Sequence, residues 1–128
     1  MPIVKVYGLP GSFTGHGCLI ELKQLLAATT AANIPNLPAS QVTVFLPRDM
    51  DAEVGKECVI FVDGLFNRSE RTSDVRKQLA RGLVIALSEF LAKRCPSTRS
   101  RLIECFVRPF DPRGGFAAGC YGAERNEG

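Results

Sequence analysis

Apolar positions in the first half of the chain follow two patterns, one typical of β-strands and one typical of an α-helix. Residues 2–9 read PIVKVYGL, a short run rich in β-branched side chains that is typical of a strand. A second run of this kind, VTVFLPRD, begins at Val42 and predicts another strand. Between the two runs, leucines recur at the spacing of one face of a helix, namely Leu19, Leu22, Leu25 and Leu26.

The second half repeats this order. Residues 58–65 read CVIFVDGL, and a last apolar run, LIECFVRP, begins at Leu102. A helix is predicted between them, because apolar residues step by four along one face and charged residues fall outside that stripe. Thr72 or Ser73 is suited to cap its N-terminus. The stripe consists of Val75, Leu79, Leu83, Leu87 and Leu91, with Phe90 beside it.

The two halves therefore form an internal repeat. Both leading strands end in Val-x-Gly-Leu, and they start 58 − 2 = 56 residues apart. The closing strands start 102 − 42 = 60 residues apart. We read the chain as one domain, 1–128, built from repeats 2–50 and 57–119, with a polar, acidic link at about 48–56.

A strand, a crossover helix and a second strand in one sheet are parallel and right-handed. Two such β-α-β units side by side predict an α/β (α+β sandwich) fold, with a four-stranded mixed sheet and both helices on one face. The strands are apolar on both sides, with Val4 and Val6 facing one way and Ile3 and Tyr7 the other. A sheet of this kind needs a second covering layer, so we expect a homo-oligomer in which other copies supply it.

Composition excludes several classes of protein. Hydrophobic residues make up 45% of the chain and charged residues 23%, which is ordinary for a folded domain. No apolar run is long enough to span a membrane, and the N-terminus lacks the pattern of a secretory signal. A net charge of +3 does not indicate a nucleic-acid partner. The five cysteines form no CxxC pair, and the single His16, expected in an exposed loop, adds little as a metal ligand, so we expect a reducing, cytoplasmic setting.

Pro2 has two interpretations. Proline lacks an N–H and is tolerated at the first residue of a strand. Alternatively, removal of Met1, which is usual before a small residue, leaves Pro2 with a free secondary amine. A model α-amino group has a pKa of about 7.7–8.0, and burial and nearby arginines both lower that pKa. The amine would then be a general base at neutral pH.

Arg68 and Arg71 precede the second predicted helix. Guanidinium groups bind carboxylates through paired hydrogen bonds, and the N-terminus of a helix also favours anions. The alternative is that both are solvated loop residues. The glycines of GSFTGHG do not match the GxxxxGK[ST] pattern of a phosphate-binding loop.

The chain resembles the tautomerase superfamily in three features. They are Met-Pro-Ile before a short strand, the duplicated β-α-β unit and the stretch IFVDGLFNRSER. The last of these is similar to the part of the cis-3-chloroacrylic acid dehalogenases in which two arginines, matched by Arg68 and Arg71, bind the substrate carboxylate. GGFAAG resembles the end of 4-oxalocrotonate tautomerase (4-OT), which matches Phe116 to an active-site phenylalanine. Arg101 matches a further substrate arginine, with Arg99 as a competing match.

The resemblance implies a trimeric or hexameric assembly and a cofactor-independent reaction. The N-terminal proline acts in this family as general base or acid on small keto, enol or unsaturated carboxylic acids. The implied site is Pro2 as catalytic base, with Arg68, Arg71, Arg101 and Phe116 binding the substrate. No metal, nucleic-acid or membrane partner is implied.

The chain departs from the family pattern at several positions. Thr29 or Thr30 stands where the dehalogenases have a histidine, Cys105 where they have a tyrosine, and Ser12 where 4-OT has an arginine. Cys58 takes the place of Pro2 in the second repeat. These differences favour simple tautomerisation over hydration-type dehalogenation. They also leave open a non-catalytic trimeric binding or structural protein of the same fold and, less favoured, an anion- or nucleotide-binding module.

Overall fold

The computed structural model describes residues 1–10, 16–47, 57–95 and 102–122. Every predicted strand and helix is present, and two short 3-10 turns are added. His16 is the first residue of the first helix and not part of a loop, which corrects its predicted position. The elements are β1 (Ile3–Tyr7), α1 (His16–Asn33), η1 (Ala39–Gln41), β2 (Thr43–Phe45), β3 (Glu57–Phe66), α2 (Ser73–Arg94), β4 (Leu102–Phe110) and η2 (Pro112–Gly114).

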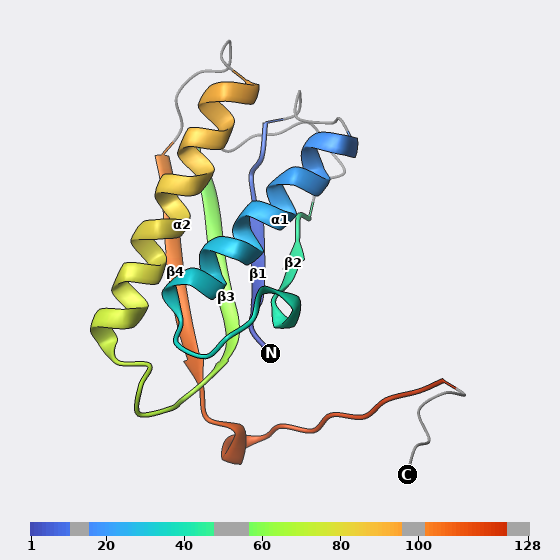
Figure 1. The fold of residues 1–128 in the computed structure, drawn as a ribbon, viewed down its shortest axis with the longest axis vertical. Coiled ribbons are helices and arrows are strands. Elements are labelled where there is room, and N and C mark those ends of the chain that lie inside the picture. Colours follow the sequence, from blue (N-terminus) through green and yellow to red (C-terminus); the bar gives the residue numbers. More distant parts are fainter. Residues whose placement is uncertain (11–15, 48–56, 96–101, 123–128) are drawn as a thin grey trace.

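The four strands form one sheet in the order β2-β1-β3-β4. Within each repeat the strands are parallel, and the two repeats meet where β1 runs antiparallel to β3, with Ile3 opposite Asp63 and Tyr7 opposite Val59. Both helices lie on the same face of this sheet (Figure 1). The predicted mixed sheet with two helices on one face is therefore confirmed.

The core lies between this sheet and the two helices. Successive strand residues point to opposite faces, and on β1 and β3 Val4, Val6, Ile60 and Val62 are completely buried. The α2 stripe meets them, as predicted from its spacing of four. The fully buried helix leucines are Leu22 and Leu26 of α1 and Leu79, Leu83 and Leu87 of α2.

The two Val-x-Gly-Leu sequences have the same structural role. Gly8 and Gly64 have positive φ values of +83° and +72°, a region that side-chain-bearing residues rarely adopt. A Cβ atom on Gly8 would overlap the carbonyl oxygen of Glu57. A Cβ atom on Gly64 would lie 2.9 Å from the carbonyl oxygen of Met1. Each glycine thus gives room to the backbone that enters the first strand of the other repeat.

In the described part of the chain, the opposite face of the sheet carries no helix (Figure 1). It presents an aromatic row in which the rings of Tyr7 and Phe61 are 5.9 Å apart and those of Phe61 and Phe106 are 5.6 Å apart. Asp63 lies on the same face and accepts two hydrogen bonds from the Arg108 guanidinium, at 2.5 and 2.7 Å. No helix in the described part of the chain is long and apolar enough to cross a membrane.

Candidate active site at the end of strand β3

Pro2 is buried at the entrance to β1. Its carbonyl oxygen accepts a hydrogen bond from the backbone N–H of Thr43, at 3.1 Å, which ties it to β2. On its other side lies Gly64 of β3, whose missing Cβ leaves room for the Met1–Pro2 peptide. Met1 itself is 62% exposed. While Met1 is attached, the Pro2 nitrogen belongs to a peptide bond and cannot take up a proton.

Arg68 and Arg71 lie in the loop between β3 and α2, as predicted. The backbone N–H of Arg71 donates to the Arg68 carbonyl at 3.0 Å, which closes a turn. The Arg71 Nη1 donates to the carbonyl oxygen of Phe66 at 2.9 Å, so its guanidinium folds back towards the end of β3. Arg68 is exposed.

The Arg71 guanidinium has an unused donor. Its Nε is buried and has no hydrogen-bond partner. Burial lowers the pKa of Arg71, and the positive charge of Arg68 lowers it further. A buried N–H without an acceptor is costly, so this group is suited to receive an anionic oxygen.

Phe116 belongs to a cluster of three phenyl rings. Its ring centre is 4.9 Å from that of Phe66, in an edge-to-face arrangement, and 6.4 Å from that of Phe110. Phe66 and Phe110 are the last residues of β3 and β4, and they pair on these neighbouring strands with their rings 6.0 Å apart. Phe116 remains 52% exposed, so the cluster presents an open aromatic surface.

Four of the predicted site residues therefore lie at the same end of the sheet, namely Pro2, Arg68, Arg71 and Phe116. Pro2 lies beside Gly64, while Arg71 bonds the backbone of Phe66 and Phe116 contacts its ring. The N-terminus, the loop after β3 and η2 lie together at this end (Figure 1). Arg101 and the competing Arg99 lie outside the described residues.

Phe66 was not among the predicted site residues, although it links two of them. Its sequence signal is weak, because an apolar residue at the end of a strand is usually read as core. The pairing of β3 with β4 shows why Phe66 matters. After the register shift between Val62 and Leu65, Phe66 lies opposite Phe110. That irregularity coincides with Gly64.

The cysteines in the sheet do not offer nucleophiles. The Cys58 thiol donates to the Gly8 carbonyl at 3.2 Å, and burial raises its pKa to about 11. Burial raises the pKa of Cys105 to about 12. Both thiols therefore stay protonated at neutral pH. Within the described ranges, no group of three or more His, Cys, Asp and Glu side chains is arranged to hold a metal ion.

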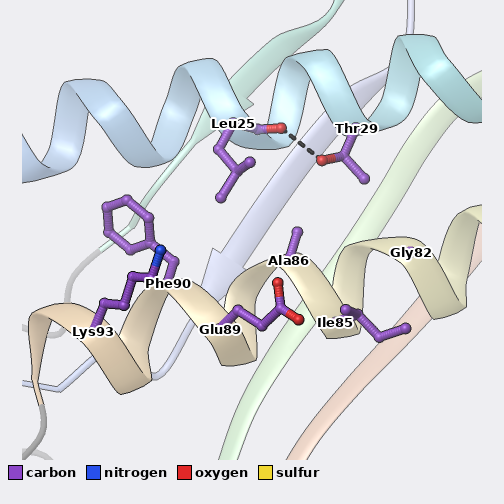
Figure 2. A pocket seen from close by; sticks show the side chains of 8 residues that line it. All are labelled: Leu25, Thr29, Gly82, Ile85, Ala86, Glu89, Phe90 and Lys93. Carbon is purple, nitrogen blue, oxygen red and sulfur yellow. Dashed lines mark hydrogen bonds between the residues drawn. The ribbon is translucent and has the colours of Figure 1, made fainter.

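A separate pocket of about 300 Å³ lies between the two helices (Figure 2). It contains none of the predicted site residues. The Thr29 hydroxyl at its edge donates to the Leu25 carbonyl at 2.8 Å and is thus used within α1. The lining consists of Leu25, Thr29, Gly82, Ile85, Ala86, Glu89, Phe90 and Lys93.

No family model and no curated protein sequence matches the chain. Solved structures do match it. A fused 4-OT described as an asymmetric trimer is 22% identical with a TM-score of 0.61, and the match covers 91% of this chain and 92% of the other. N1, a member of the cis-3-chloroacrylic acid dehalogenase family, is 14% identical with a TM-score of 0.63, over 97% of this chain and 85% of the other.

Malonate semialdehyde decarboxylase is a further match, 12% identical with a TM-score of 0.54, over 96% of this chain and 92% of the other. At such identities the likeness shows the fold alone. It extends over nearly the whole of each chain and includes both repeats. The chain therefore has the fold of the tautomerase superfamily, as the resemblance of its sequence indicated.

Proposed function

We propose that the protein is a cofactor-independent tautomerase that acts on a small keto, enol or unsaturated carboxylic acid. The observation that carries the proposal is the buried, unpartnered Nε of Arg71. It belongs to the loop that follows the strand against which Pro2 packs. A proton acceptor and an anion-binding group at one end of a sheet are the minimum that this reaction requires.

In the proposed reaction Pro2 acts after Met1 has been removed. Arg68 and Arg71 bind the substrate carboxylate, and Phe116 lines the unsaturated part of the molecule. The neutral amine of Pro2 takes a proton from the carbon next to the carbonyl, and the electron pair moves into an enolate. The proton then returns to another atom of the same substrate, so the amine is regenerated. Arg101 is the proposed partner of the charge that develops on the oxygen.

We further propose that the protein works as a homo-oligomer, most simply a trimer. The fused 4-OT structures are described as trimers. The helix-free face of the sheet supports such an assembly, because none of the described elements covers it and Tyr7 and Phe106 are 40% and 47% exposed. A neighbouring copy would then cover the row of Tyr7, Phe61 and Phe106.

The test is ketonisation of phenylenolpyruvate or 2-hydroxymuconate by protein whose intact mass shows that Met1 is absent. Pro2→Ala should lower kcat by about 10²–10⁴-fold, the usual contribution of a general base. Pro35→Ala, which changes an exposed proline in the loop after α1, is the matched control and should keep the wild-type rate. Equal rates for wild type and Pro2→Ala would contradict the mechanism.

A non-catalytic binding protein of the same fold is the second candidate. The hydroxyls of Thr29 and Thr30 bond to the carbonyls of Leu25 and Leu26, each at 2.8 Å. They therefore supply no second acid or base from α1, where the dehalogenases have a histidine. Carboxylate binding without any turnover, by protein that lacks Met1, would favour this candidate.

A further inference from the structure

Arg76 connects the start of α2 to the loop that carries the proposed anion site. Its Nη1 donates to the carbonyl oxygen of Arg71 at 2.6 Å. Its backbone N–H donates to the Thr72 carbonyl at 3.0 Å, as expected in the first turn after an N-cap at Thr72. Arg71 comes directly before the N-cap residue Thr72. The carbonyl oxygen of Arg71 accepts its hydrogen bond from the Arg76 guanidinium.

Arg71 is consequently held at two points. The Phe66 carbonyl fixes one end of its guanidinium, and Arg76 fixes its backbone. Fixing a long arginine side chain in one rotamer costs conformational entropy. A donor that is already fixed therefore binds an acceptor more strongly than a mobile one. These contacts leave the Arg71 Nε as the buried donor without a partner.

The loop contains one acid, Glu70, whose negative charge partly offsets the effect of Arg68 on Arg71. Within the described part of the chain, Arg68, Arg71 and Arg76 form no salt bridge with a carboxylate; the ion pairs that are present involve other basic residues. The Arg76 guanidinium donates to the Arg71 carbonyl and not to an acid. An incoming carboxylate would form such a direct ion pair with Arg71.

We propose that Arg76 is a positioning residue of the anion site: it holds Arg71 in the orientation that binds the substrate carboxylate. This inference rests on the carboxylate-binding half of the proposed function and does not depend on proton transfer by Pro2. Arg76 acts through Arg71, so its removal should matter only while Arg71 is present.

Calorimetric binding of phenylpyruvate to the full chain tests this directly, without turnover. Arg76→Ala should raise the Kd about tenfold, the scale of one lost hydrogen bond to a charged group. Arg76→Lys, which keeps a charged donor, should restore most of the affinity. Arg81→Ala removes the same charge from an exposed position of α2 and is the matched control, with less than about a twofold change expected for a surface site.

A double-mutant comparison separates positioning from general charge. In the Arg71→Ala background, Arg76→Ala should change the Kd by less than about twofold, because the two residues act as a unit. In turnover assays on protein without Met1, the same substitution should raise KM and leave kcat nearly unchanged. Unfolding temperatures verify that each variant is folded.

Three results would overturn the inference. The first is that the wild type does not bind phenylpyruvate. The second is that Arg76→Ala and Arg81→Ala raise the Kd for phenylpyruvate equally. The third is that the effects of the Arg71 and Arg76 substitutions on the free energy of binding add. If the wild type binds the acid but does not turn it over, the proposed catalysis fails, and the same binding series still decides the role of Arg76.

Discussion

At the residue scale, Gly64 links the fold to the proposed chemistry. The sequence shows it only as the third letter of a repeated Val-x-Gly-Leu, equivalent to Gly8. In the structure it has a φ of +72° and gives room to the Met1–Pro2 peptide. The glycine is therefore needed both for the backbone conformation of its own strand and for the close approach of the Met1–Pro2 peptide.

We predict that Gly64→Ala lowers the free energy of unfolding by at least about 1–3 kcal/mol, the cost of placing a side-chain-bearing residue at such a backbone conformation. In protein that keeps Met1, the added methyl would also lie 2.9 Å from the Met1 carbonyl oxygen, which is backbone and cannot move freely. Urea denaturation followed by circular dichroism measures the change.

Gly114→Ala is the control for Gly64→Ala. Gly114 does not have a positive φ, and a Cβ atom there would meet nothing within 4 Å. Its substitution should leave the urea midpoint almost unchanged. If both variants unfold at the wild-type midpoint, the close approach at Gly64 does not constrain the strand entrance.

Part of the candidate site could be predicted at this scale and part could not. Pro2 and the arginine pair stand at strand and helix ends, where the sequence is easily read and side chains are available for chemistry. Arg76 was not predicted, because a helical residue on the polar face is normally read as solvated. Its contact with the Arg71 carbonyl depends on how the loop folds over the helix start, which no periodicity records.

At the element scale, the helices followed their sequence pattern more closely than the edge strand did. Thr72, one of two predicted caps, accepts the Val75 N–H at 3.3 Å and begins α2 as expected. The run from Val42 predicted a longer strand than the observed Thr43–Phe45. Among the described strands, β2 lies at the edge beside β1, and Pro47 has no N–H to extend the ladder.

The α2 stripe leads to a stability prediction. Leu83 is completely buried in the core, in the middle of this helix. Leu83→Ala should lower the free energy of unfolding by about 2–5 kcal/mol, because it removes apolar contacts and leaves a cavity. Thermal and urea unfolding of the purified variant measure the loss.

Ile85 offers a matched comparison on the same helix, because it is 49% exposed. Ile85→Ala should change stability by no more than about 0.5 kcal/mol, as is usual for surface positions. Similar losses for the two variants would mean that the stripe is not what holds α2 to the sheet.

At the scale of the whole molecule, the main unexplained feature is the helix-free face of the sheet. Phe61 lies between Tyr7 and Phe106, and the Arg108 guanidinium lies 4.3 Å from the centre of the Phe61 ring. The hydrogen bonds from Arg108 lower the pKa of Asp63, which therefore stays ionised beside these rings. Aromatic residues and arginine are enriched on surfaces that another protein layer covers.

The assembly prediction follows from this face. Phe106, 47% exposed, lies in the aromatic row, and its replacement by aspartate would place an unpaired charge in the proposed contact between copies. We expect the wild type to sediment as an oligomer, most simply a trimer, and Phe106→Asp to sediment as a monomer at the same concentration.

Ile20→Asp is the control, since Ile20 is 42% exposed on α1, in the helical layer, and should leave the assembly intact. Loss of the oligomer in both variants would point to general destabilisation, and an unchanged Phe106→Asp oligomer would show that the copies meet through another surface.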